Sequence, residues 1–132
     1  MEQIPQHAAK TIVLVEDVDL VRRLVSRLLE KEGYRVIEAV TGEEGLGILG
    51  NGEKVDLLLT DVTLPGGLNG VELGRRALEE RSDLKLICMS VSGEEEMVSD
   101  LLARAVGAAA FLGKPFSAGE LVTTVNGLLE AA

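Results

Sequence analysis

Hydrophobic residues gather in five short runs along the chain, each about the length of a β-strand. The runs are rich in β-branched and long aliphatic residues, and the first of them, TIVLV, contains no charged residue. Continuous apolar runs of this kind are typical of strands that are covered on both faces. The pattern therefore predicts buried strands over residues 11–15, 34–39, 55–60, 84–89 and 109–112.

After each run, apolar residues recur every three or four positions, which is the spacing of an amphipathic helix. The segment 41–49 is the weakest of these helices, because Gly45 and Gly47 each cost about 1 kcal/mol relative to alanine. Further helices are expected over residues 71–81, 94–106 and 120–130. The clearest helix ends at Gly33 as a C-cap, and its apolar stripe consists of Leu20, Val21, Leu24, Val25, Leu28 and Leu29.

Polar residues at the starts of four predicted helices support these assignments. In a capping box, a side chain at the helix start accepts a hydrogen bond from the third helical residue, which is often glutamate. Four pairs have this spacing or its asparagine analogue: Thr41 and Glu44, Asn69 and Glu72, Ser92 and Glu95, Ser117 and Glu120.

Five strand-then-helix units predict an α/β fold with a parallel sheet, right-handed crossovers and helices on both faces. At this length the expected architecture is a flavodoxin-like, doubly wound five-stranded sheet with strand order 2-1-3-4-5 and five helices. Residues 1–9 are expected to form a flexible N-terminal tail, and residues 10–132 a single domain. Sites in such sheets form beyond the carboxyl ends of the strands, here between the first and third strands.

Composition and charge narrow the classes of partner. The net charge of −9 opposes direct binding to nucleic acid or to anionic lipid, which requires a positive surface. No apolar run approaches the roughly 20 residues of a membrane span, and the first residues contain no apolar signal segment. The single cysteine, Cys88, cannot form an internal disulfide and is expected to be a core thiol. A cytoplasmic protein that binds neither membrane nor nucleic acid is expected.

Polar residues lie at the ends of four predicted neighbouring strands. Glu16 and Asp17 follow the first strand, Asp61 the third, Ser90 the fourth and Lys114 the fifth. Because neighbouring strands are about 4.8 Å apart, these side chains should converge on one edge of the sheet. Crowded carboxylates raise one another's pKa unless a cation joins them, and Mg²⁺ prefers such oxygen ligands.

The remaining groups suit phosphoryl chemistry. A lysine ammonium is a mobile point charge for phosphate, and a serine hydroxyl can donate a hydrogen bond to a phosphoryl oxygen. An aspartate can itself be the nucleophile and form an aspartyl phosphate. Each residue by itself could have an ordinary structural role, but their complementary chemistry at adjacent strand ends favours a joint site.

From Lys10 to its end, the chain resembles the response-regulator receiver domains of two-component signalling. The matching segments are VLVED, LLLTDVTLP, ICMSVSG and GAAAFLGKPF, in the family's order and at the corresponding strand ends. The resemblance implies a domain that is not itself an enzyme. It would accept a phosphoryl group from a histidine kinase or a histidine phosphotransfer protein. It would then signal to a partner through the face formed by the fourth helix, fifth strand and fifth helix, as a monomer or a phosphorylation-dependent dimer.

The resemblance also assigns roles to individual residues. Asp61 corresponds to the phosphoacceptor, and Mg²⁺ would be bound by Asp17, by Asp61, by the backbone carbonyl of Thr63 and, through water, by Glu16. Ser90 corresponds to the switch hydroxyl, which moves toward the phosphoryl group. Phe111 corresponds to the aromatic residue whose rotamer reports the state of that hydroxyl. Lys114 corresponds to the lysine that pairs with the phosphoryl group, and its bond to Pro115 is expected to be cis.

Three features depart from the family pattern. Glu16 stands where many members have aspartate, Phe111 lacks the hydroxyl of the tyrosine often found there, and the loop PGGLNG is one residue longer than is common. The loop resembles receivers attached to hybrid histidine kinases.

Three other functions are less consistent with these residues. A phosphatase of the haloacid-dehalogenase type would require an acid two residues after Asp61, where this chain has Thr63. A flavodoxin-like nucleotide binder would require a glycine-rich or hydroxyl-rich loop after the first strand, where this chain has Glu16 and Asp17. A receiver-like docking module without phosphorylation would not require the complete set of site residues.

Overall fold

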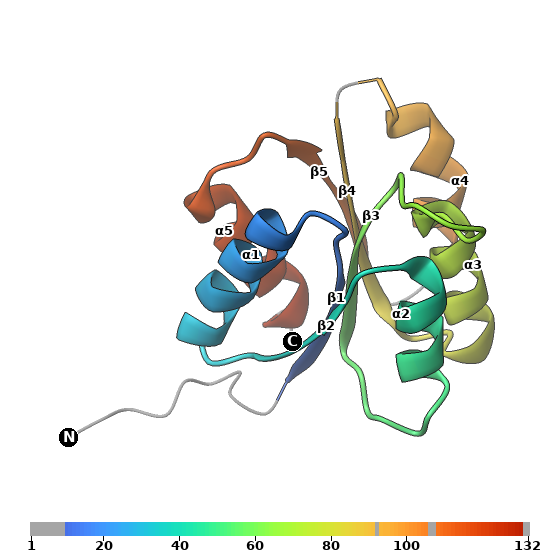
Figure 1. Cartoon of the computed structure of the whole chain (residues 1–132), viewed down its shortest axis with the longest axis horizontal. Coiled ribbons are helices and arrows are strands. Elements are labelled where there is room, and N and C mark those ends of the chain that lie inside the picture. Colours follow the sequence, from blue (N-terminus) through green and yellow to red (C-terminus); the bar gives the residue numbers. More distant parts are fainter. Residues whose placement is uncertain (1–9, 92, 106–107, 131–132) are drawn as a thin grey trace.

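The computed structural model describes residues 10–91, 93–105 and 108–130, and its five strands form one parallel sheet (Figure 1). The strand order is β2-β1-β3-β4-β5, which confirms the predicted flavodoxin-like arrangement. The strands are β1 (Thr11–Val15), β2 (Arg35–Ala39), β3 (Leu57–Asp61), β4 (Lys85–Val91) and β5 (Ala109–Lys114). The N-terminal tail that was expected over residues 1–9 lies outside the described residues.

Five helices cover the two faces of the sheet. Two of them, α1 (Asp19–Lys31) and α5 (Ala118–Leu129), lie side by side on one face (Figure 1). The other face is covered by α2 (Gly42–Leu49), α3 (Gly70–Glu80) and α4 (Glu95–Arg104). No helix in this described part of the chain combines the length and the hydropathy that a bilayer span requires.

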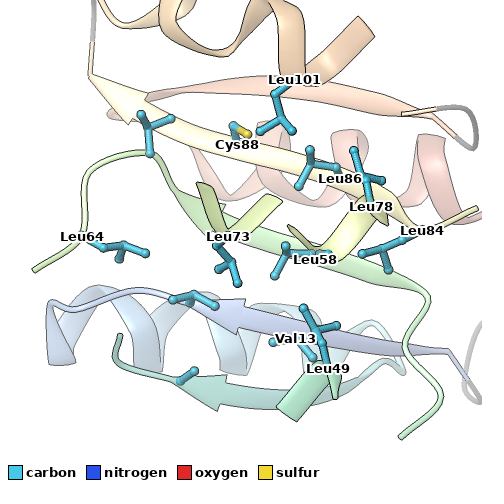
Figure 2. Close-up of a cluster of buried hydrophobic side chains, with 14 of the residues drawn as sticks. Val13, Leu49, Leu58, Leu64, Leu73, Leu78, Leu84, Leu86, Cys88 and Leu101 are labelled. Atoms are coloured by element: carbon cyan, nitrogen blue, oxygen red, sulfur yellow. The ribbon is translucent and has the colours of Figure 1, made fainter. Parts of the chain in front are cut away.

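Alternate residues of each strand enter two separate hydrophobic clusters, one on each face of the sheet. On β1, for example, Ile12 and Leu14 face α1 and α5, whereas Val13 and Val15 face α2 and α3. Figure 2 shows the cluster under α2, α3 and α4, to which Cys88 belongs. Burial raises the pKa of this thiol to about 12, so Cys88 is a core residue, as expected.

The last two strands continue beyond their predicted ends, to Val91 and Lys114. Ser90 pairs with Gly113 and Val91 with Lys114, although glycine and lysine are poor strand formers. The pairing outweighs the local propensity, and it makes Lys114 the last residue of β5. The bond from Lys114 to Pro115 is cis, as predicted.

Hydrogen bonds at the helix starts confirm three of the four predicted caps. Ser117 and Glu120 form a complete capping box, and the side chains of Thr41 and Asn69 accept hydrogen bonds from the amides of Glu44 and Glu72. The fourth prediction was wrong in its position. Ser92 lies outside the described residues, and the N-cap of α4 is Glu94, which makes no side-chain capping bond.

The apolar stripe of α1 is only partly buried. Val25 and Leu29 pack in the core, whereas Leu20 and Leu24 are 78% and 57% exposed. The stripe is wider than the surface that the sheet and α5 can cover, so its outer edge faces solvent. Leu20 and Leu24 form an exposed apolar surface with Val91 and Phe116, which we call the α1 patch.

Candidate functional site

The predicted site residues meet at the carboxyl edge of the sheet. Single oxygens of Glu16, Asp17 and Asp61 all lie within 4.8 Å of one another. Glu16 and Asp61 are buried, at 0% and 4% exposure, whereas Asp17 is exposed. The structure therefore brings the three carboxylates together at the ends of β1 and β3.

Lys114 joins two of these carboxylates from the end of β5. Its Nζ lies 2.7 Å from Glu16 Oε1 and 2.7 Å from Asp61 Oδ1. The other oxygen of Glu16, Oε2, accepts a hydrogen bond of 3.0 Å from the backbone amide of Val18. Both oxygens of Glu16 are thus occupied by contacts within the protein.

The pKa values of the two buried acids, Glu16 and Asp61, shift in opposite directions. Burial raises the pKa of Asp61 to about 8, and the adjacent Glu16 adds to the rise, although Lys114 opposes it. Burial also opposes ionisation of Glu16, but hydrogen bonds with Asp61, Lys114 and Val18 outweigh it and lower the pKa of Glu16. Burial likewise opposes the charge on Lys114, but the two carboxylates outweigh it and raise its pKa. Burial thus opposes ionisation of Asp61 more strongly than that of Glu16, although Lys114 lies 2.7 Å from an oxygen of each.

Two buried oxygens at the site lack a hydrogen-bond partner among the described residues. They are Asp61 Oδ1, which has only the ion-pair approach of Lys114, and Ser90 Oγ. Buried polar atoms are nearly always hydrogen-bonded, so such an atom points to a ligand that completes the site. Three clustered carboxylates with one such oxygen are a donor set that fits a hard divalent cation.

A glycine of α3 fixes the position of Asp61. A Cβ at Gly70 would lie 1.7 Å from the backbone oxygen of Asp61, and the amide of Gly70 donates a 2.8 Å hydrogen bond to Val62 O. Any other residue at this position would displace α3 or the end of β3. The sequence alone does not indicate this role of Gly70, because the close approach depends on tertiary packing.

Ser90 and Phe111 lie on neighbouring strands, on the face of the sheet opposite to that of Lys114. In the β4–β5 pairing, Cys88 is opposite Phe111, and Ser90 is opposite Gly113. Gly113 has no side chain, and a Cβ there would lie 3.8 Å from Phe111 Cε2. The ring of Phe111 is therefore next to the strand position across from Ser90.

Thr63 is exposed in the loop after β3, and its side chain contacts a residue that the sequence did not suggest. Thr63 Oγ1 donates a 2.8 Å hydrogen bond to Glu94 Oε2, at the start of α4. The sequence also did not suggest Arg22 of α1, because a charged residue next to an apolar helical stripe is usually solvated. Arg22 is 8% exposed and hydrogen-bonds to the backbone carbonyl of Glu16.

Comparisons with known proteins agree with this fold. The family model of the response regulator receiver domain matches residues 12–126. The chain is 40% identical over 121 residues to the sensor kinase CckA of Brucella abortus, covering 91% of this chain and 12% of that protein. It is 30% identical over 115 residues to the sporulation initiation phosphotransferase F of Bacillus subtilis, covering 87% of this chain and 90% of that protein.

Other relatives are longer than this chain, which spans 52% of the phosphate regulon regulatory protein PhoB of Pseudomonas aeruginosa. Among solved structures, a CheY-like receiver domain protein from Methanospirillum hungatei is similar with a TM-score of 0.81 and 32% identity, covering 92% of this chain and 94% of that one. The response regulator TrrA from Thermotoga maritima, in complex with Mg²⁺ and BeF, has a TM-score of 0.78 and 28% identity, covering 92% and 100%. The matched span, the strand order and the similarity to whole receiver proteins show that the chain belongs to the response regulator receiver domain family.

Proposed function

We propose that Asp61 is the residue of this receiver domain that accepts the phosphoryl group. The observation that carries the proposal is the surroundings of Asp61 Oδ1. This oxygen is buried at the end of β3, accepts no hydrogen bond from the described residues and lies 2.7 Å from Lys114 Nζ. It is therefore an acceptor atom with room for a new bond and with a cation beside it.

In the transfer, an oxygen of ionised Asp61 attacks the phosphorus of a phosphohistidine on the donor protein. The phosphorus–nitrogen bond of the donor breaks, and its electron pair remains on the imidazole nitrogen. Lys114 then neutralises charge on the phosphoryl oxygens. Positioning and charge stabilisation supply most of the catalysis in such transfers, and a preformed edge of charged groups with its bound cation would provide both.

Mg²⁺ is the cofactor that the acidic cluster suits best. Asp17 and Asp61 would be direct ligands, with the Thr63 backbone carbonyl, and Glu16 would act through water. When bound, Mg²⁺ supplies positive charge to the carboxylates and to the phosphoryl oxygens. The fit rests on the cluster of three carboxylates and on the buried Asp61 oxygen, which accepts no hydrogen bond from the described residues and has the Lys114 ammonium beside it.

Ser90 and Phe111 are proposed as the switch. A phosphoryl group on Asp61 would attract the hydroxyl of Ser90, which has no hydrogen-bond partner among the described residues, and Phe111 could then move toward the space over Gly113. The face of α4, β5 and α5 would change and bind the downstream partner. A Ser90→Ala variant should accept phosphate without the NMR shift changes that wild type shows on this face, and unchanged shifts in wild type would contradict the switch.

The α1 patch is proposed as the surface that meets the phosphodonor, a histidine kinase or a histidine phosphotransfer protein. A donor must bring its phosphohistidine to Asp61, so it has to cover surface next to the site. The patch is continuous with Lys114 and Pro115 and presents exposed leucines of α1. Leu20→Ser with Leu24→Ser should slow transfer from the donor protein but not from acetyl phosphate, whereas Met97→Ser, on α4, should affect neither.

The domain is proposed to act as a phosphoacceptor and not as an enzyme on other substrates, in a cytoplasmic setting and without contact to nucleic acid or membrane. It would be a monomer or a dimer that forms on phosphorylation. The decisive experiment is incubation with acetyl phosphate, read by intact mass. One phosphoryl group should be added in Mg²⁺ and none in EDTA, and a wild-type protein that stays unmodified in Mg²⁺ would contradict the proposed function.

A further inference from the structure

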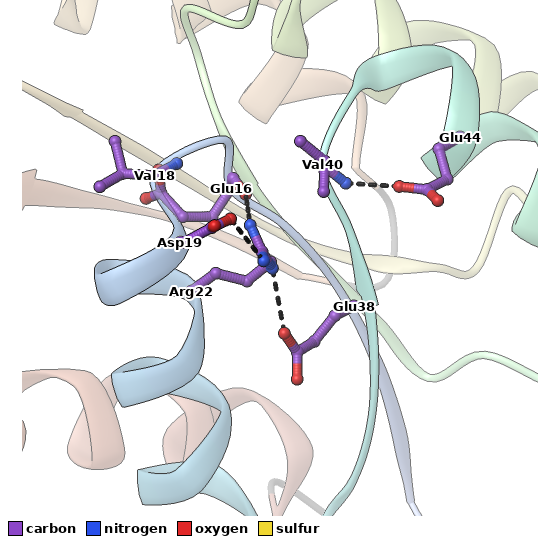
Figure 3. A network of polar contacts seen from close by, with 7 residues as sticks. All are labelled: Glu16, Val18, Asp19, Arg22, Glu38, Val40 and Glu44. Atoms are coloured by element: carbon purple, nitrogen blue, oxygen red, sulfur yellow. Dashed lines mark hydrogen bonds and ion pairs between the residues drawn. The ribbon is translucent and has the colours of Figure 1, made fainter.

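A nearly buried arginine ties the loop of the site to two other elements. Arg22, on the first turns of α1, is 8% exposed and uses all three nitrogens of its guanidinium (Figure 3). Its Nη1 donates to the backbone carbonyl of Glu16 at 3.1 Å, its Nε to Glu38 Oε1 on β2 at 3.0 Å, and its Nη2 to Asp19 Oδ1 at 2.7 Å. One side chain thus joins the end of β1, the edge strand β2 and the start of α1.

The contact with Glu16 replaces a partner that the sheet does not supply. The amide of Glu16 still donates to Ala39 O on β2, at 3.1 Å, but the regular strand β1 ends at Val15. The carbonyl of Glu16 therefore points out of the ladder, in a buried position, and Arg22 satisfies it. A buried carbonyl without a partner is unfavourable, so removing Arg22 should make the backbone at Glu16 rearrange.

The side chain of Glu16 connects this backbone position to the carboxylate site. Its Oε1 bonds to Lys114, and its Oε2 bonds to the amide of Val18. Val18 is the N-cap of α1 and makes no side-chain capping bond, so the loop has no hydroxyl or carboxylate cap at that position to hold it. Among the contacts of Glu16, the one from Arg22 anchors its backbone carbonyl.

We propose that Arg22 is a positioning residue of the phosphorylation site, which holds the Glu16–Asp17 loop in the conformation that binds the divalent cation. The inference rests on the proposed function, because it assumes that this acidic cluster is the metal site. A guanidinium suits the role better than an ammonium, since its fixed planar fork can satisfy three acceptors at once. Glu38 and Asp19 hold the fork from both sides, and Arg22 in turn lowers the pKa of Asp19.

The test compares four variants with wild type. Arg22→Gln removes the charge and the fork, Arg22→Lys keeps the charge alone, and Glu38→Gln weakens one anchor while Arg22 remains. The matched control is Arg23→Gln, which makes the same charge change on the neighbouring residue. Arg23 is exposed and makes no hydrogen bond or ion pair with the described residues.

Two measurements are made on each folded protein: the Mg²⁺ dissociation constant by titration, and hydrogen exchange of the Val18 amide without metal. Arg22→Gln should weaken Mg²⁺ binding roughly tenfold, as loss of an outer-shell partner commonly does, and should accelerate Val18 exchange. Arg22→Lys and Glu38→Gln should have intermediate effects, and Arg23→Gln should match wild type. The rate of phosphorylation by acetyl phosphate at saturating Mg²⁺ should change little, because the loop is then held by the ion.

Mg²⁺ affinity and Val18 exchange equal to wild type in folded Arg22→Gln would overturn the inference while leaving the proposed function intact. An equal loss in Arg23→Gln would also overturn it, because the effect would then be one of charge alone. If Arg22→Gln does not fold, Glu38→Gln decides the question by the same two measurements. A wild-type protein that binds Mg²⁺ but takes up no phosphoryl group would instead contradict the proposed function.

Discussion

The two ends of β3 carry an aspartate each, in opposite circumstances. Asp56 precedes the strand, and its Oδ2 accepts a 2.8 Å hydrogen bond from the amide of Thr11. Asp61 ends the strand, is 4% exposed and has an oxygen that accepts no hydrogen bond from the described residues. The first carboxylate completes the backbone pairing at the amino edge of the sheet, whereas the second is the one for which we propose a bond to a group from outside.

The difference follows from what surrounds each end. At the amino edge, side chains satisfy backbone atoms, as Arg81 does for the carbonyls of Leu49 and Glu53. At the carboxyl edge, charged side chains face one another, and burial raises the pKa of Asp61 to about 8. Polar groups that stabilise a fold are satisfied within it, while a site for transfer chemistry retains unsatisfied groups at a cost in stability.

The largest expected effect distinguishes the two aspartates by phosphorylation. Asp61→Asn should abolish uptake of phosphate from acetyl phosphate in Mg²⁺, because an amide is not a nucleophile for this transfer. Asp56→Asn should keep uptake close to the wild-type extent, and its effect should appear in stability, as a loss of about 1 kcal/mol. Intact mass measures the uptake of phosphate, and urea unfolding measures the stability. Uptake by Asp61→Asn, or its loss in a folded Asp56→Asn, would remove the distinction.

The second expectation concerns the pH dependence of metal binding. At the proposed site, Mg²⁺ would bind the ionised form of Asp61, whose pKa burial raises to about 8, so protons would compete with the ion below that pH. The affinity should rise roughly tenfold per pH unit up to about pH 8 and level off above it. Titrations of wild type across this range should show the slope, and Asp61→Asn should remove it. A wild-type affinity that is flat below pH 8 would show that Asp61 is already ionised.

A smaller effect should appear in the stability of the metal-free protein. A carboxyl whose pKa is raised on folding favours the folded state most at low pH, below its ordinary value of 3.8, and loses that contribution as the pH rises through about 8. Asp61→Asn should therefore be more stable than wild type above pH 8, by roughly 1–3 kcal/mol, and the difference should shrink as the pH falls. Asp56→Asn should show no such gain. Denaturation in EDTA at several pH values measures the difference, and a less stable Asp61→Asn at high pH would contradict the assigned burial cost.

Much of the fold could be predicted because its signals are local. Apolar runs and three-to-four-residue spacing identified all ten elements, and topology rules then placed Glu16, Asp17, Asp61 and Lys114 at one edge. Their mutual contacts in the structure agree with that placement. The roles assigned to these residues stay predictions until they are measured.

What the sequence did not reveal depends on tertiary packing. The exposure of Leu20 and Leu24 depends on how much of α1 the sheet covers, and the burial of Arg22 depends on Glu38 from another strand. The contact of Gly70 with Asp61 and that of Glu94 with Thr63 also join segments that are distant in the chain. No periodicity or local motif encodes such pairs.

The most direct test of the central claim is to locate the phosphoryl group. Aspartyl phosphate is an acyl phosphate, so borohydride reduces it to homoserine, and peptide mass spectrometry then identifies the residue that carried it. After treatment with acetyl phosphate and Mg²⁺, homoserine should appear at position 61 in wild type and nowhere in Asp61→Asn. Reduction at Asp17 or at another acidic residue, with Asp61 unchanged, would contradict the account.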